Sequence, residues 1–70
     1  MANDIENNFT YHSPLPGQSE RYATIRAHAK SLAKLIDYEC PGSREKSLAM
    51  TKLEESVMWA NAAIARNEEE

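Results

Sequence analysis

An all-α fold is what this sequence of 70 residues predicts: two long helices folded back on each other, behind a short N-terminal arm. Two observations lead to it. Apolar residues recur at steps of three and four in two separate stretches, the spacing that places side chains on one face of a helix. Between the stretches, Pro41 and Gly42 interrupt the pattern for only a few residues, and no segment shows the strict alternation of a half-buried strand.

Residues 1–17 form the predicted arm. The segment is polar at first and then presents Tyr11 and His12 ahead of the Ser-Pro-Leu-Pro run at 13–16. Two prolines in three residues favour an extended path and prevent a helix there. A short helical turn before Phe9 is compatible with the sequence but has no strong signal.

The first predicted helix runs from about Gln18 to Glu39, with Gly17 or Ser19 as its N-cap. Its apolar seam is heptad-like, which suits packing against another helix. The seam consists of Tyr22, Ile25, Ala29, Leu32 and Ile36, widened by Ala33 and Leu35. Cys40-Pro41-Gly42 ends the helix, because proline cannot continue it and glycine tolerates a left-handed turn.

The second predicted helix runs from Ser43, whose hydroxyl suits the N-cap position, to about Asn67. A connection of three or four residues predicts an antiparallel hairpin, so that residues 18–70 form a single domain. The seam of this helix consists of Met50, Leu53, Val57, Ala60 and Ile64. Over residues 57–65 only Asn61 is polar, which is typical of a helix buried on all sides.

Size and composition limit what can stabilise this fold. A domain of this length buries only about 60% of the surface that its unfolded chain exposes, so it needs a further source of stability. Cys40 is the only cysteine, which excludes an intrachain disulfide and suits a reducing cytosol. The histidines, His12 and His28, lie far apart with no second thiol nearby, which predicts no metal site. Oligomerisation remains as the source of stability, and we expect other copies of the chain to cover the apolar segment 57–65.

Charge and hydropathy exclude two classes of partner. A net charge of −3 argues against DNA binding, which normally shows as a basic domain. No leader opens the sequence, and no apolar stretch approaches the ~18 residues that span a bilayer, so we expect a soluble, intracellular protein without a membrane partner. The charge is nevertheless uneven, because residues 21–34 hold four cations and no acid.

Catalysis is the class of function that the sequence supports least. It contains no HxxxH or CxxC pair, no glycine-rich phosphate loop and no nucleophile elbow. We therefore expect a protein that is not an enzyme and that uses no cofactor.

One group of residues points to a ligand instead. Tyr22, Arg26, Lys30 and Lys34 follow each other at steps of four along one flank of the first helix. An aromatic ring beside cations suits a nucleotide, because arginine grips phosphate through two bonds and also stacks. Tyr11 and His12, on the arm, are placed to stack on a base. The alternative is an ordinary solvated face, and spacing alone leaves both open.

Arg66, near the end of the second helix, also has two interpretations. A cation in the last turn interacts favourably with the helix dipole. The functional alternative is a phosphate contact at a symmetric junction of several chains.

Several short segments resemble one known family. They are His12-Ser13-Pro14, Gly17-Gln18, Glu20-Arg21-Tyr22, Cys40-Pro41, Ser43 to Ala49, Thr51 to Glu55 and Met58 to Ala62. In this combination the chain closely resembles the small phage-encoded anti-CBASS sponges, proteins that sequester cyclic oligonucleotides and share their helical hairpin with sponges that counter Thoeris defence. The resemblance covers roughly residues 12–68 and is most specific over residues 51–66.

The resemblance implies a homohexamer in the cytoplasm of an infected bacterium. It would hold cyclic dinucleotides such as 3′,3′-cyclic GMP–AMP, so that the CBASS effector of the host is never triggered. Tyr11 would stack on a base and Arg26, a position where the family also has lysine, would contact phosphate between two protomers. We add His12 and Lys30 as neighbours of this dinucleotide site. A separate pocket between three protomers would take cyclic trinucleotides such as cyclic tri-AMP, with Arg66 on phosphate.

A different reading competes with the sponge. A helical phage or prophage adaptor, or a regulator that binds a host protein, would use the apolar segment 57–65 as its partner surface.

Overall fold

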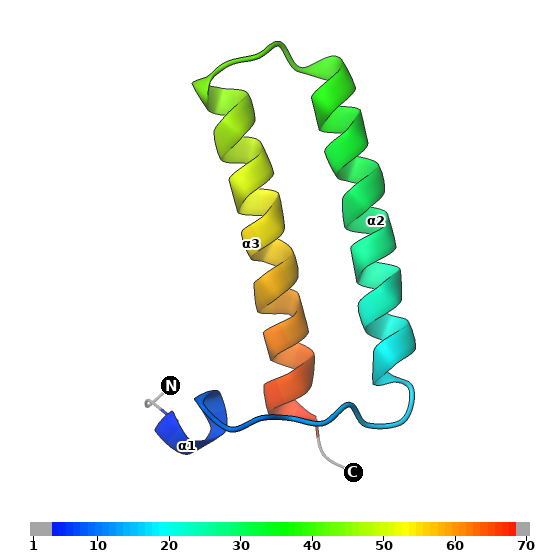
Figure 1. Cartoon of the computed structure of the whole chain (residues 1–70), viewed down its shortest axis with the longest axis vertical. Helices are drawn as coiled ribbons and strands as arrows, with labels where there is room; N and C mark the ends of the chain where they lie inside the picture. Colours follow the sequence, from blue (N-terminus) through cyan, green and yellow to red (C-terminus); the bar gives the residue numbers. More distant parts are fainter. Residues whose placement is uncertain (1–3, 69–70) are drawn as a thin grey trace.

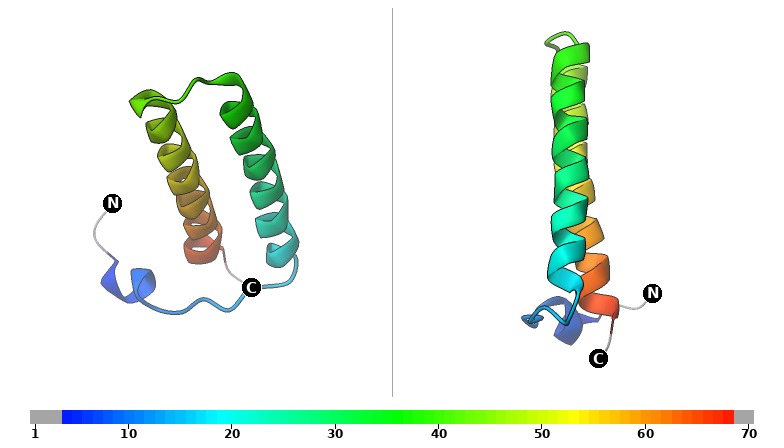
Figure 2. Two further views of the ribbon diagram at one scale, coloured as in Figure 1. Left: turned by 45° about the horizontal axis from the view of Figure 1, so that its top comes forward. Right: turned by 90° about the vertical axis from the view of Figure 1, so that its right-hand side faces the viewer.

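The computed structural model describes residues 4–68, which form three helices: α1 (Ile5–Asn8), α2 (Gln18–Glu39) and α3 (Arg44–Asn67). The two long helices run antiparallel, and the arm with α1 passes beneath the open end of the hairpin, close to the end of α3 (Figure 1). Seen edge-on, α2 and α3 form a single layer (Figure 2). The predicted all-α hairpin is therefore confirmed, and the arm contains one helical turn that the sequence signalled only weakly.

The helices begin at recognisable local signals. The Asp4 carboxylate accepts the Asn7 backbone N–H at 3.1 Å and caps α1, while the Ser43 hydroxyl accepts the Lys46 backbone N–H at 3.1 Å and caps α3. Ser43 is thus the cap that the sequence predicted. Each cap satisfies a backbone donor that the first turn of a helix leaves without a partner.

A type II turn leads into α2. Gly17 has φ 85° and ψ −14°, the left-handed values that the third residue of this turn requires, and Pro16 occupies the position before it. The Gln18 backbone N–H closes the turn on the Leu15 carbonyl at 3.0 Å. Gly17 is therefore the N-cap residue of α2, and no side-chain hydrogen bond caps this helix.

The tip of the hairpin differs from the prediction in its backbone. Cys40 is extended, with φ −102° and ψ 134°, because Pro41 disfavours the helical region for the residue before it. No residue of this turn has a positive φ, so the expected left-handed conformation at Gly42 is wrong. Across the tip, the Lys46 ammonium donates to the Asp37 backbone carbonyl at 3.0 Å and forms an ion pair with the Asp37 carboxylate at 3.1 Å.

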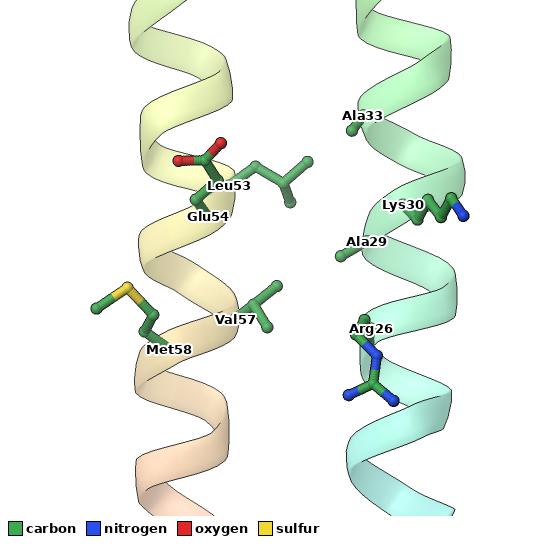
Figure 3. A pocket seen from close by; sticks show the side chains of 8 residues that line it. All are labelled: Arg26, Ala29, Lys30, Ala33, Leu53, Glu54, Val57 and Met58. Atoms are coloured by element: carbon green, nitrogen blue, oxygen red, sulfur yellow. The ribbon is translucent and has the colours of Figure 1, made fainter.

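The seams of the two helices face each other. All five predicted residues of the α3 seam are half-buried or buried. On α2, however, Leu32 and Leu35 are 45% and 54% exposed, whereas Ala33, which was expected only to widen the seam, is half-buried and takes the place of Leu32. At 100° per residue, Ala33 lies about 40° from the direction of Ala29, whereas Leu32 lies about 60° away on the other side. Figure 3 shows Ala29 and Ala33 turned toward α3, with Leu53 and Val57 turned toward α2.

The single chain has very little interior. Ile64 is the one buried apolar residue among residues 4–68, whereas Met58 is 67% and Trp59 is 64% exposed. Met58 and Trp59 both belong to the apolar segment 57–65. Because the hairpin leaves them exposed, any cover for them has to come from outside it. None of the helices described here has the length and apolar character needed to cross a membrane.

Candidate functional site

The predicted ligand residues line two separate grooves of the hairpin. The first, which we call the arm groove, has a volume of about 370 Å³ and lies between the arm and the last turns of α3. It is lined by Asn8, Thr10, Tyr11, His12, Tyr22, Asn61, Ala62, Ala65 and Arg66. The second, the helix groove, has a volume of about 400 Å³ and is lined by Arg26, Ala29, Lys30, Ala33, Leu53, Glu54, Val57 and Met58 (Figure 3).

Tyr11 and His12 enter the arm groove from an extended segment of the arm. Tyr11 is 83% exposed, so its ring is open to a flat ligand. His12 is half-buried, and its Nε2 lies 2.9 Å from the Asn7 carbonyl. Because a carbonyl oxygen only accepts, Nε2 carries the proton in this bond, which sets the tautomer of the neutral ring.

Asn7 holds this part of the arm against α3. Its side-chain Nδ2 donates to the Arg66 backbone carbonyl at 3.0 Å, across 59 residues of sequence. That carbonyl is one of the last four of α3, which have no partner within the helix. The bond therefore satisfies a free acceptor and at the same time brings the groove-lining part of the arm to the end of α3.

Arg66 is half-buried in the arm groove, and its guanidinium makes no ion pair with any residue between 4 and 68. It shares the groove with two tyrosines, Tyr11 and Tyr22. Asn61 lines the same groove, and its buried Oδ1 finds no hydrogen-bond partner within the described chain. Aromatic faces and a positive charge meet here, which is the chemistry that a nucleotide phosphate and base require.

The helix groove has an apolar floor with charged residues along it. Arg26 and Lys30 are exposed and pair with no acid among residues 4–68, although Glu54 lines the same groove. The Lys30 side chain extends away from α3 (Figure 3). Arg26 therefore lies at the groove together with the small side chains of the seam, while the Lys30 charge is directed outward.

Within one chain, Tyr11 and Arg26 do not share a groove: Tyr11 lies with Arg66, and Arg26 lies with Lys30. The grooves are nevertheless neighbours along α2. Tyr22 of the arm groove precedes Arg26 of the helix groove by one turn, a rise of about 6 Å. Lys34, the last member of the predicted stripe, lines neither groove.

Sequence reasoning missed the side chains that hold the arm in place. Gln18 is only 4% exposed and bonds both to Leu15 in the arm and to Glu68 after α3. Arg21, one of the four cations of residues 21–34, forms an ion pair with Glu68 at 2.8 Å. Hydrogen bonds from Gln18 and then from Arg21 hold the pKa of the Glu68 carboxyl below its ordinary value of 4.5. No local sequence signal could have found these pairings, because they join residues 47 and 50 positions apart.

Comparison with protein families finds one match. A family model described as Acb2/Tad1, hairpin domain, matches residues 1–65. The match includes the arm, α2 and most of α3, and it ends one residue before Arg66. Neither the curated proteins nor the solved structures include a match to the chain.

Proposed function

The chain belongs to the Acb2/Tad1 hairpin domain family, and from this membership we propose that it is a non-catalytic sponge that removes cyclic nucleotide signals by binding them. The family implies a nucleotide sponge directed against CBASS or Thoeris defence. The proposed function is narrower: the protein acts in the cytoplasm of an infected bacterium, where it withholds cyclic dinucleotides and trinucleotides from a CBASS effector. The proposed division of the chain is an arm, residues 1–17, and one hairpin domain, residues 18–70.

The observation that carries this proposal is that tyrosine rings, the exposed ring of Tyr11 among them, lie near guanidinium groups without an ion-pair partner in the described part of the chain. Arg66 lies beside Tyr11 and Tyr22, and Arg26 lies one turn of α2 further on. Neither arginine has an acidic partner among residues 4–68. A cation left free of an acid keeps its full attraction for phosphate, and an exposed ring can stack on any base.

We place the dinucleotide site between two copies of the chain. Tyr11 and Arg26 line different grooves of one chain, so a ligand that uses both takes Tyr11 from one protomer and Arg26 from its neighbour. A cyclic dinucleotide has two base–phosphate halves, which suits a junction related by a two-fold axis. His12 and Lys30 are the proposed neighbours of this site.

The trinucleotide site is proposed at a three-fold junction. Arg66 lies in the last turn of α3, so a three-fold axis near that end gathers three guanidinium groups against three phosphates. A closed assembly with two-fold and three-fold axes and six copies provides both kinds of site. The exposed Met58 and Trp59 supply apolar surface for such an assembly.

The energies required are within reach of these contacts. Submicromolar binding corresponds to more than about 8 kcal/mol. Two stacked bases at about 1–3 kcal/mol each, together with charged hydrogen bonds to phosphate at about 1.5–3 kcal/mol each, reach that range when the site is largely pre-formed.

Native mass spectrometry of the protein with and without 3′,3′-cyclic GMP–AMP tests the proposal directly. We expect a six-chain species that gains a fixed number of dinucleotides, and intact dinucleotide recovered after denaturation. A mass that no dinucleotide changes contradicts the sponge, and a cleaved dinucleotide contradicts the absence of catalysis.

One observation favours a second candidate, an adaptor that binds a host protein. The exposed Met58 and Trp59 form apolar surface that a partner helix could cover. Sedimentation separates the candidates, because a stable closed oligomer leaves this surface unavailable, whereas an adaptor sediments as a single chain.

A further inference from the structure

Gln18 stands out as a buried polar side chain with no place in the proposed ligand contacts. It is 4% exposed although it is the first residue of α2. Burying an amide costs free energy unless both of its ends are hydrogen-bonded. Both ends are: Oε1 accepts the Leu15 backbone N–H at 2.9 Å, and Nε2 donates to the Glu68 carboxylate at 3.0 Å.

These two bonds join three parts of the chain. Leu15 belongs to the arm, Gln18 begins α2, and Glu68 is the C-cap residue of α3. Arg21 strengthens the junction, because its guanidinium contacts both carboxylate oxygens of Glu68 at 2.8 and 2.9 Å. We call these three side chains, Gln18, Arg21 and Glu68, the arm clamp.

The segment that carries Tyr11 is fixed at its two ends. The Asn7 bond to the Arg66 carbonyl holds one end, and the bond between Gln18 and Leu15 holds the other. Between these points Tyr11 is 83% exposed, so its own packing does little to fix its position. Thr10 and His12, on either side of Tyr11, also bond to backbone carbonyls of α1, at Glu6 and Asn7. The direction in which the ring faces the arm groove therefore depends on these local bonds together with the two anchors, of which the Gln18–Leu15 bond is the one on the α2 side.

We propose that Gln18 is a positioning residue for ligand capture: through Leu15 it holds the arm in the conformation that presents Tyr11, and it does not touch the ligand itself. The inference rests on the proposed function. A ligand binds a partly populated conformation more weakly in proportion to the population. If loss of the clamp leaves the arm in place a tenth of the time, affinity falls about tenfold.

Gln18→Met is the variant that tests this role, because methionine keeps the length and volume of the side chain but removes both hydrogen bonds. Ser19→Ala, at the exposed next residue, is the matched control. We expect Gln18→Met to weaken calorimetric binding of 3′,3′-cyclic GMP–AMP about tenfold and to speed hydrogen exchange at the Leu15 amide in the ligand-free protein. Ser19→Ala is expected to leave both unchanged.

Combining the substitution with Tyr11→Ala distinguishes positioning from a general loss of stability. If Gln18 acts through Tyr11, the double variant binds no more weakly than Tyr11→Ala alone. Additive losses, or wild-type affinity in Gln18→Met, overturn the proposal. Should Gln18→Met fail to fold, Glu68→Ala breaks the clamp from an exposed position and is expected to weaken binding in the same non-additive way.

Failure of the proposed function and failure of the clamp proposal give different results. If the wild-type protein binds no cyclic nucleotide, the proposed function fails together with the role in capture, while fast Leu15 exchange in Gln18→Met still shows that the clamp holds the arm. If the wild-type protein binds and Leu15 exchange does not change in Gln18→Met, the clamp proposal alone is wrong.

Discussion

Tyr11 and Arg26 contribute to the proposed dinucleotide site in different physical ways. Tyr11 offers the faces of an exposed ring, and its hydroxyl is not needed for stacking. Arg26 offers a planar fork of donors that phosphate oxygens accept, and it has no acidic partner among the described residues. Each contribution can be removed without touching the other.

We expect Tyr11→Ala and Arg26→Ala each to weaken calorimetric affinity for 3′,3′-cyclic GMP–AMP by about 1–3 kcal/mol, without changing the mass of the oligomer. Tyr11→Phe keeps the ring and is expected to bind like the wild type. Lys34→Ala is the control for Arg26, because Lys34 belongs to the same stripe but lines neither groove. Wild-type affinity in both alanine variants at positions 11 and 26 would rule out this assignment.

Arg66→Ala is expected to abolish binding of cyclic tri-AMP and to spare the dinucleotide, with Arg26→Ala showing the reverse. The substitution leaves the arm anchored, because Asn7 bonds the backbone carbonyl of residue 66 and not its side chain. A competition titration on the wild-type protein gives the second check. Displacement of the trinucleotide by saturating dinucleotide would mean one shared site, as the common position of Tyr11 and Arg66 in the arm groove would permit.

At the scale of the elements, two local devices set how the arm joins the hairpin. The type II turn at Pro16 and Gly17 aims the chain into α2, and the arm clamp ties that turn to the end of α3. The turn depends on backbone conformation, whereas the clamp depends on ionisation of Glu68. They therefore respond to different perturbations.

Gly17→Ala is expected to lower the free energy of unfolding by about 1–2 kcal/mol, because φ 85° is left-handed and a Cβ is strained there. Gly42→Ala is the matched control, since Gly42 has no positive φ and no heavy atom lies within 4 Å of the added Cβ. Urea denaturation measures both. Equal stability of the two variants would contradict the turn assignment.

Acidification is expected to open the clamp. The folded state lowers the pKa of Glu68, so its stabilising contribution is complete above the ordinary value of 4.5 and is lost as pH falls through the lower folded value. The side-chain amide resonances of Gln18 should therefore be constant from pH 7 to pH 5 and shift below about pH 4.5. In Glu68→Gln this shift should be absent. If the wild type and Glu68→Gln give the same titration curve, a carboxylate other than Glu68 controls the resonance shift.

At the scale of the whole molecule, the single hairpin lacks an interior. One buried apolar residue among the described ones cannot balance the entropy of ordering two long helices. Met58 and Trp59 remain open on the segment that composition marks as buried. We therefore expect association with further copies of the chain, which the proposed function also requires.

Ala63→Glu is expected to give smaller and less stable assemblies, because it puts a charge into the exposed face of the apolar segment where copies should meet. Ala63 is preferred to Ala62, which lines the arm groove and would alter ligand binding as well. Ser56→Glu, on the same helix and also exposed, is the control. Sedimentation and thermal melting measure the effect, and an unchanged mass and melting temperature in Ala63→Glu would place the interface elsewhere.

The sequence alone determined the features that depend on neighbours along the chain. The bounds of α2, the Ser43 cap and the α3 seam follow from periodicity and capping chemistry, which act within a turn or two of helix. The same local rules placed Leu32 in the α2 seam, where helix rotation puts Ala33 instead. The motifs that carry the family resemblance are also short stretches of neighbouring residues, and the family match confirms the resemblance.

Only the tertiary structure decided which distant residues meet. Asn7 contacts Arg66 across 59 residues, and Gln18 contacts Glu68 across 50. No periodicity carries such a pairing, because it depends on where the arm crosses the end of the hairpin. The same crossing put Tyr11 beside Arg66 and away from Arg26 within one chain. Chain geometry, which sets the direction of the arm at Gly17, is the reason that these partners could not be read from residue types alone.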